Sequence, residues 1–207
     1  MIKNIIFDIS NVILNFNVSE VLTSFTKVKE NQKFILDNII NSPEWLGNSL
    51  IDTGFIKRED AIEIVKDRTN HVKDKLISNF WNTYNDFAFI DNRVIDLIKQ
   101  LKNNNYRVYL LSNTNPYTHD FVSKSGVFEL VDGYVLSYIE HQIKPYQGIY
   151  KTLINRYNLT AEECLFIDDK YENVKTANEL GIKGENVQPD DYESIIKLLE
   201  KYDIKRS

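Results

Sequence analysis

Residues 5–14 read IIFDISNVIL, an apolar run that reaches an aspartate, Asp8, and continues into a polar turn. Near-continuous apolar character, rich in β-branched and aromatic side chains, is typical of a strand that is buried on both faces of a parallel sheet. The run therefore predicts a first strand over residues 3–8. Similar runs occur at residues 106–112 (YRVYLLS), 132–137 (DGYVLS) and 164–168 (CLFID), with a weaker one at 184–187.

Amphipathic segments of helix length separate the later strands. Apolar residues recur at helical spacing on one face of each segment, as in helices that pack on a sheet. Asp91 and Gly181 stand where an N-cap and a C-terminal glycine are expected. The segments are residues 91–103, 146–157 and 170–180, with a last helix behind Asp190. This alternation predicts an α/β fold, a Rossmann-like doubly wound parallel sheet.

Residues 17–90 interrupt the alternation with a block in which every predicted element is a helix. The predicted helices span residues 18–29, 32–41, 43–50, 58–68 and 72–85. An all-helical block inserted after the first strand predicts two units: an α/β core of residues 1–16 and 91–207, and a helical cap of residues 17–90. We expect the aromatic residues of this block to form its hydrophobic core. Gly54 predicts a turn within this block.

Composition limits the possible partners. The 207 residues carry a formal net charge of −5, whereas nucleic-acid binding needs a basic footprint. The sequence has neither the ~20 continuous apolar residues of a membrane span nor a signal segment at its N-terminus. Its single cysteine, Cys164, agrees with a reducing compartment. We therefore expect a cytoplasmic protein that binds neither nucleic acid nor membranes. The sequence does not predict the oligomeric state.

Polar residues follow the predicted strands at the point where each strand ends. They are Asp8, the run 112–114, and the pair Asp168 and Asp169, with Lys144 in a loop after the third strand. Ligands of doubly wound sheets bind beyond the carboxyl ends of the strands. Carboxylates hold Mg²⁺, while a hydroxyl, amides and an ammonium neutralise phosphate oxygens. One such aspartate alone is more often a turn or helix cap, but four features in order predict metal-assisted phosphate chemistry.

Four motifs resemble those of the haloacid dehalogenase (HAD) superfamily of aspartate-nucleophile hydrolases. They are IIFDISNV, VYLLSNTN, IKPYQGIY and LFIDDKYENVKTANELGI, and the resemblance covers the whole chain. The first motif is most similar to that of a small-capped subgroup that includes sugar-phosphate phosphatases acting on glucose 1-phosphate. The resemblance implies a Mg²⁺-dependent phosphatase that acts on a small phosphorylated metabolite, with sugar phosphates as the expected class.

The resemblance also implies the roles of individual residues in phosphoryl transfer. Asp8 would be the nucleophile that forms an aspartyl-phosphate, which divides one slow hydrolysis into two steps. Ser112 would donate its hydroxyl to the phosphoryl group, with help from the backbone N–H of Asn113. Lys144 would offset the negative charge of the nucleophile and of the phosphate.

The same resemblance implies a set of Mg²⁺ ligands. Asp8 and Asp169 would bind the ion directly through their carboxylates, and Ser10 would bind it through its backbone carbonyl. Asp168 would act through a water molecule. Asn173, which stands where many relatives have an acid, would orient these groups.

Ser10 departs from the pattern of typical phosphatases in the superfamily. Its position usually holds an aspartate that protonates the leaving oxygen, a function worth ~10²–10⁴ in rate, and a serine hydroxyl is too weak an acid for this. One alternative is therefore a feebly catalytic binding or regulatory protein, although the retained Asp8 and Lys144 argue against it. A 2-haloacid dehalogenase is a further alternative, and the acidic pair at 168–169 speaks against it. If another residue supplies the proton, His141 is the first candidate.

Overall fold

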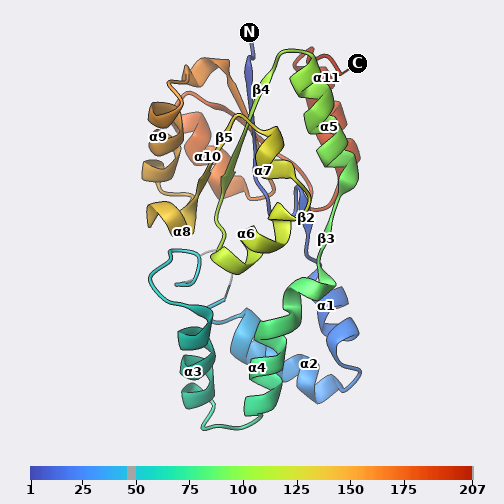
Figure 1. The fold of residues 1–207 in the computed structure, drawn as a ribbon, viewed down its shortest axis with the longest axis vertical. Helices are drawn as coiled ribbons and strands as arrows, with labels where there is room; N and C mark the ends of the chain where they lie inside the picture. Colours follow the sequence, from blue (N-terminus) through green and yellow to red (C-terminus); the bar gives the residue numbers. More distant parts are fainter. Residues whose placement is uncertain (46–49, 207) are drawn as a thin grey trace.

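Five parallel strands form the central sheet of the computed structural model, which describes residues 1–45 and 50–206 (Figure 1). The strands are β1 (Asn4–Phe7), β4 (Arg107–Ser112), β5 (Gly133–Leu136), β6 (Cys164–Asp168) and β7 (Lys183–Asn186). Their order in the sheet is β5-β4-β1-β6-β7. From β1 the chain moves outward to β4 and β5, and then returns to the other side of β1 for β6 and β7. This doubly wound arrangement confirms the predicted fold class and all five predicted strands.

Helices cover both faces of the sheet, as Figure 1 shows with α5 and α11 on one side and α9 and α10 on the other. These helices are α5 (Asn92–Asn103), α9 (Gln147–Arg156), α10 (Tyr171–Glu179) and α11 (Tyr192–Lys201). Successive residues of β1 point to opposite faces: Ile5 joins the cluster under α5 and α11, and Ile6 joins the one under α9. Every residue of β1 is buried, which explains its continuous apolar pattern.

The predicted helix boundaries in the core are largely confirmed. Asp91 caps α5, where its side chain accepts from the N–H of Arg93, and Gly181 follows α10 with φ +82°. The last helix begins one residue later than expected, because Asp191 accepts from the N–H of Ser194 and is its N-cap. Several short elements were not predicted. They are α6 (Pro116–Ser123), α7 (Val127–Leu130), α8 (Ser137–Glu140) and the 3₁₀ turn Ala161–Glu163.

The chain leaves and re-enters the sheet region through two short antiparallel strands, which the sequence did not reveal. They are β2 (Leu14–Asn15) and β3 (Phe89–Ile90), and Leu14 pairs with Ile90. Between them lies the helical block at the bottom of Figure 1. Its elements are α1 (Val18–Phe25), α2 (Lys29–Ile35), a π-helix (Leu36–Ile40), α3 (Arg58–Arg68), α4 (Asp74–Thr83) and a 3₁₀ turn (Tyr84–Phe87).

The helical block has its own hydrophobic cluster. Trp45, Phe80, Trp81 and Tyr84 pack against one another in it, with ring centroids 4.9–6.4 Å apart, as expected for these aromatic residues. The single helix predicted over residues 32–41 was wrong in its second half, where the chain forms a π-helix. Of the predicted helix over residues 43–50, residues 46–49 lie outside the described part of the chain, and the described residues on either side form turns.

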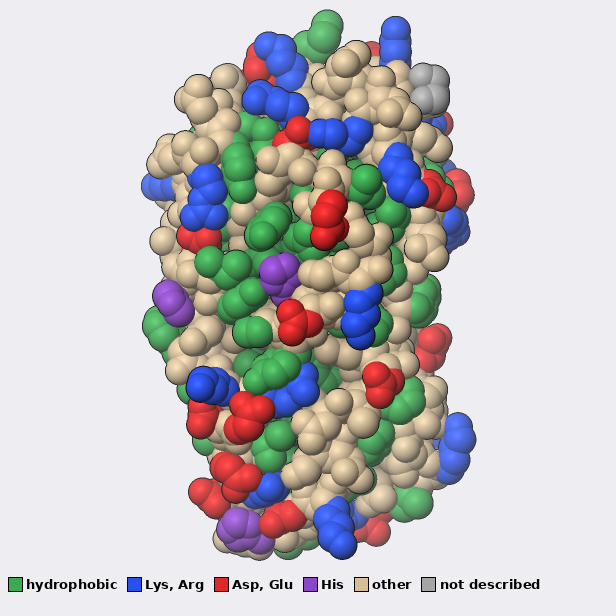
Figure 2. All heavy atoms as spheres, in the orientation of Figure 1, with side chains coloured by type: hydrophobic (Ala, Val, Ile, Leu, Met, Phe, Trp, Pro, Cys, Tyr) green, Lys and Arg blue, Asp and Glu red, His purple; other side chains and the backbone are tan. Residues whose placement is uncertain are grey.

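Acidic and basic side chains are interspersed over the face shown in Figure 2. Within the described residues, no helix combines the length and the apolar character needed to cross a membrane.

Candidate active site

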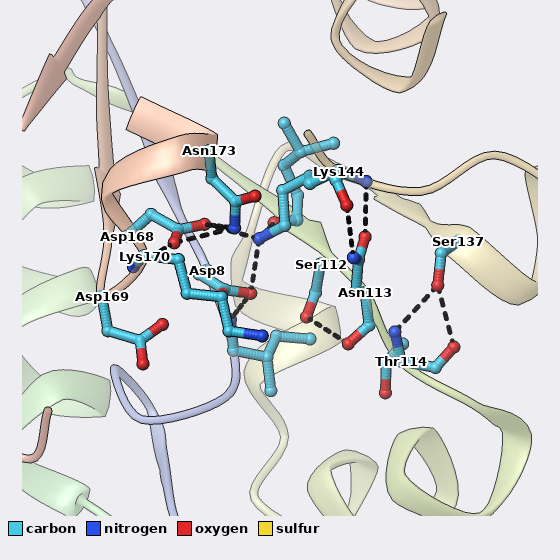
Figure 3. A network of polar contacts seen from close by, with 12 residues as sticks. Asp8, Ser112, Asn113, Thr114, Ser137, Lys144, Asp168, Asp169, Lys170 and Asn173 are labelled. Carbon is cyan, nitrogen blue, oxygen red and sulfur yellow. Dashed lines mark hydrogen bonds and ion pairs between the residues drawn. The ribbon is translucent and has the colours of Figure 1, made fainter. Parts of the chain in front are cut away.

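Lys144 lies at the centre of a buried ionic cluster at the carboxyl edge of the sheet (Figure 3). Its ammonium, Nζ, is 2.9 Å from Oδ1 of Asp8 and 2.7 Å from Oδ2 of Asp168. It also donates to the carbonyl of Leu111 at 2.9 Å. Asp8 directly follows β1 and Asp168 ends β6, and these strands are neighbours. The fold therefore brings the first and fourth sequence motifs together, and Lys144 of the third motif joins them.

The oxygens of Asp168 are engaged by protein donors. Besides Lys144, they accept from Nδ2 of Asn173, 3.0 Å from each oxygen, and from the backbone N–H of Lys170 at 2.8 Å. Asp168 is fully buried. Such a carboxylate is fixed in orientation and holds Lys144 and Asn173 in place.

The electrostatics of the cluster are dominated by burial. Burial raises the pKa of the Asp8 carboxyl from its ordinary 3.8 to about 7. The Lys144 ammonium opposes this rise, and the neighbouring carboxylates of Asp168 and Asp169 add to it. Burial alone would lower the pKa of Lys144, but Asp168 and Asp8 outweigh it and hold that pKa above its usual value.

Three carboxylates of the cluster can face one cation. Asp8, Asp168 and Asp169 each offer an oxygen within 4.8 Å of the others. Oδ1 of Asp169 is buried and has no hydrogen-bond partner among the described residues, which is costly unless a ligand is present. Carboxylate oxygens are the ligands that Mg²⁺ prefers. The residues present therefore fit a Mg²⁺ ion.

The turn after Asp8 presents a further oxygen. Asn11 N donates to Leu14 O at 2.7 Å and Leu14 N donates to Ile9 O at 2.8 Å, so the carbonyl of Ser10 takes part in neither bond of this turn. Asn11 has φ +59°, a conformation that asparagine tolerates better than most residues. Its Nδ2 also donates to Oδ2 of Asp169 at 2.9 Å. The sequence did not reveal this contact, which joins the first and fourth motifs.

The loop after β4 is built around Lys144 as well. Nδ2 of Asn113 donates to the carbonyl of Lys144 at 2.9 Å, and the Lys144 N–H donates back to Oδ1 of Asn113 at 2.8 Å. Ser112 is fully buried, and its hydroxyl donates to the carbonyl of Asn113 at 3.4 Å. Figure 3 shows Ser112 beside Asp8 and the Asn113 side chain against Lys144. The side chain of Asn113 thus positions the lysine, which the motif alone did not indicate.

A cavity of about 270 Å³ opens from this cluster toward the helical block. Its lining includes Asp8, Ser10, Asn113, Lys144, Asp169 and Asn173, all predicted site residues. Ser112 and Asp168 lie behind that surface. The helical block and the strands next to it contribute other lining residues: Leu14, Phe16, Val18, Ile40, Trp45, Asp52, Tyr84 and Asn85.

His141 lies outside the cavity lining. Its exposed ring pairs through Nδ1 with the carbonyl of Thr53 at 2.8 Å and stacks on Phe55 at a centroid distance of 5.2 Å. It therefore holds the turn of the helical block against the core and is poorly placed to supply a proton to the leaving group.

Comparison with known proteins identifies the class to which this fold and site belong. A model of the haloacid dehalogenase-like hydrolase family matches residues 2–181. The chain therefore belongs to this family and is a hydrolase, as its four motifs predict.

Two similar proteins of known activity are phosphatases. A sesquiterpene phosphatase of Aspergillus oryzae is 26% identical over 88% of this chain and 88% of its own length. A D-ribitol-5-phosphate phosphatase of Bacteroides thetaiotaomicron is 27% identical over 92% of this chain and 93% of its own. A HAD family enzyme of Bacteroides thetaiotaomicron, solved in complex with magnesium and inorganic phosphate, has a TM-score of 0.74 and 27% identity, covering 95% of this chain and 99% of that one.

Proposed function

We propose that this chain is a Mg²⁺-dependent phosphatase that hydrolyses monoesters of small phosphorylated metabolites through an aspartyl-phosphate on Asp8. One observation carries the proposal: Asp8, paired with Lys144, lies at the polar end of a cavity beside Asp169, whose Oδ1 has no hydrogen-bond partner among the described residues. A nucleophile, a counter-charge and a cation site at one point are the requirements of phosphoryl transfer.

In this proposal one carboxylate oxygen of Asp8 attacks phosphorus as the bond between phosphorus and the leaving oxygen breaks, and the leaving oxygen takes up a proton from water. Water then cleaves the aspartyl-phosphate and releases inorganic phosphate. Lys144 compensates the charge that meets on Asp8 and on the phosphoryl group, and it is pre-oriented by Asp168 and Asn113. The backbone N–H of Asn113 would bind a phosphoryl oxygen, and so would the hydroxyl of Ser112 once it turns away from the carbonyl of Asn113.

Asp8, Asp169 and the carbonyl of Ser10 would hold Mg²⁺, with Asp168 acting through water and Asn173 orienting Asp168. When bound, the ion supplies positive charge that neutralises phosphoryl oxygens. Asn11 keeps one oxygen of Asp169 occupied, which leaves the other for the ion.

We propose that residues 17–90 act as a cap over an α/β core formed by residues 1–16 and 91–207. The paired strands β2 and β3 connect the two parts, and residues from both line the cavity. A cap of this kind excludes water from the reacting groups.

Sugar phosphates are the proposed substrate class, and a cytoplasmic location is proposed from the single cysteine. The relatives support phosphate esters in general, since one acts on D-ribitol 5-phosphate and the other on sesquiterpene phosphates by name. The glucose 1-phosphate subgroup stays a prediction.

A panel of phosphorylated metabolites, assayed for phosphate release with Mg²⁺ and with EDTA, tests the proposal. We expect turnover that needs Mg²⁺ and that Asp8→Asn abolishes, because an amide is a poor nucleophile. The matched control is Glu44→Gln, which alters a buried acid outside the cavity lining. Turnover that survives in Asp8→Asn would refute the role of Asp8. No turnover on any substrate would favour the alternative of a binding or regulatory protein.

A further inference from the structure

Asp52 brings a carboxyl group from the helical block to the cavity that Asp8 and Lys144 line. Its side chain is fully buried, although it belongs to a turn between the π-helix and α3. Burying a carboxyl group is costly unless partners hold it. Packing of the turn alone does not require a carboxyl group at this position beside the cavity.

Two residues of the core hold Asp52 in place. Nδ2 of Asn115 donates to its Oδ1 at 3.0 Å, and the hydroxyl of Ser137 donates to its backbone carbonyl at 2.6 Å. The carboxamide of Asn115 has only one orientation available, because its oxygen accepts from the N–H groups of Tyr117 and Thr118 at 3.1 Å as the N-cap of α6. The start of α6 therefore directs an N–H toward Asp52.

The turn that carries Asp52 is docked closely against the core. Gly54 has φ +73°, and a Cβ at this position would overlap the carbonyl oxygen of Tyr138. The contacts of His141 with Thr53 and Phe55 lie beside it. The position of Asp52 is thus set from both parts of the molecule, and the turn at Gly54 brings it to the cavity.

The chemistry of the cavity changes from one end to the other. The lining cations are Lys144 and Lys170, among the residues that the structure describes, and both come from core loops beside Asp8. The part formed with the helical block combines apolar surface with hydrogen-bonding groups. Two of these, Oδ1 of Asn85 and Oγ1 of Thr114, are buried and have no partner among the described residues.

From this arrangement we infer that Asp52 recognises hydroxyl groups of the leaving group and excludes leaving groups that carry a second negative charge. The inference rests on the proposed function. A carboxyl oxygen accepts hydrogen bonds from hydroxyls, and so does Oδ1 of Asn85, which has no partner within the described part of the chain. The C–H faces of a polyol suit the rings of Trp45 and Tyr84. A carboxylate or second phosphate would meet the like charge of Asp52, and among the described residues the helical block adds no cation to the lining, so its buried charge would be costly. The substrate class is a neutral polyol or sugar phosphate.

The volume limits the size of the substrate. A cavity of about 270 Å³ holds on the order of nine water molecules at ~30 Å³ each. This volume is slightly below the ~300–1,000 Å³ that is usual for ligand pockets. A short polyol phosphate suits this space better than a long hydrocarbon chain, which would also leave the polar groups without partners.

The test compares Asp52→Asn with the wild type on D-ribitol 5-phosphate, phosphoglycolate, fructose 1,6-bisphosphate and 4-nitrophenyl phosphate. Loss of a hydrogen bond to a charged group is expected to lower kcat/KM roughly 10- to 100-fold. We expect kcat/KM for the polyol phosphate to fall by that factor and kcat/KM for the anionic substrates to rise or stay constant. Turnover of 4-nitrophenyl phosphate, which offers no hydroxyl, should change little. Glu44→Gln, whose partner Arg68 lies away from the cavity, should alter none of these ratios.

Three results would overturn the inference. Equal losses on all four substrates would make Asp52 a structural residue, and unchanged ratios would mean that it does not contact the substrate. A loss that follows the pKa of the leaving group would make it a proton donor. A wild type inactive on the whole panel would instead refute the proposed function. In that case, calorimetry measures the affinity of each panel compound for the Asp8→Asn variant and for the double variant that also carries Asp52→Asn. If the Asp8→Asn variant does not bind the polyol phosphate more tightly than the double variant does, the inference is overturned.

Discussion

Asp8→Asn should stabilise the protein in metal-free buffer above neutral pH. The pKa of the Asp8 carboxyl rises from 3.8 to about 7 in the folded state, with burial as the main cause. A raised carboxyl pKa means that the folded state holds its proton more tightly than the unfolded state. The free energy of unfolding therefore falls as the pH rises from about 4 to about 7, and the full loss is present above pH 7. Asparagine does not ionise and avoids this loss, while Lys144 keeps its ion pair with Asp168.

The size of the effect follows from the pKa difference. A rise from 3.8 to about 7 corresponds to about 4 kcal/mol when the carboxylate is fully charged. Part of the loss is already present at pH 5, so the advantage of Asp8→Asn should grow by about 3 kcal/mol between pH 5 and pH 8.5. For a domain of this size, the Tm of Asp8→Asn minus the Tm of the wild type should therefore be roughly 6–12 °C larger at pH 8.5 than at pH 5.

Urea unfolding in EDTA at several pH values measures this difference. Ser112→Ala is the control, because it alters a buried side chain of the same site without removing an ionisable group. Added Mg²⁺ should stabilise the wild type more than Asp8→Asn, since a ligand of the folded state adds stability according to its affinity. A stability difference that does not change with pH would refute the reasoning. It would mean that Asp8 ionises as readily in the fold as in the unfolded chain.

Other substitutions test separate parts of the structure. Lys144→Met should destabilise the protein by roughly 3–5 kcal/mol in denaturant unfolding at pH 8, because it leaves buried carboxylates without their cation; a loss below 1 kcal/mol would contradict the buried ion pair. Gly54→Ala should lower kcat/KM while the four motifs of the core keep their geometry, because a Cβ would collide with the carbonyl of Tyr138 and displace the turn. Unchanged kinetics would mean that the turn does not position the cavity wall. Ser10 cannot protonate the leaving oxygen near neutral pH, so rates should fall more steeply with leaving-group pKa than in a Ser10→Asp variant; equal rates for aryl and alkyl phosphates, with chemistry limiting, would show that another group supplies the proton.

The strands could be predicted from the sequence because burial on both faces leaves a local pattern. All of β1 is buried and all of it is apolar except Asn4. The elements that were missed have weak local patterns. The strands β2 and β3 are two residues long, too short for any periodicity, and α6 buries only Thr118 and Val122. The π-helix at Leu36–Ile40 continues the helical pattern of α2, so periodicity alone gave one long helix.

The phosphate end of the cavity was predictable because its residues stand at the ends of successive strands. The other end was not. Asp52 meets Asn115 across 63 residues of chain and Ser137 across 85, and these contacts depend on how the helical block docks. No spacing in the sequence signals them.

The two ends of the cavity can change independently of each other. The chemical groups come from core loops, whereas residues of the helical block form much of the wall that the leaving group would touch. Substitutions in the block can therefore change the substrate while Asp8, Lys144 and Asp169 keep their geometry. Two relatives at similar identity, named for a sesquiterpene and for D-ribitol 5-phosphate, agree with such a separation. Within it, we propose that the buried carboxyl group of Asp52, which Asn115 orients, favours a leaving group with hydroxyls over a hydrocarbon, because a hydrocarbon offers that carboxyl group no hydrogen bond.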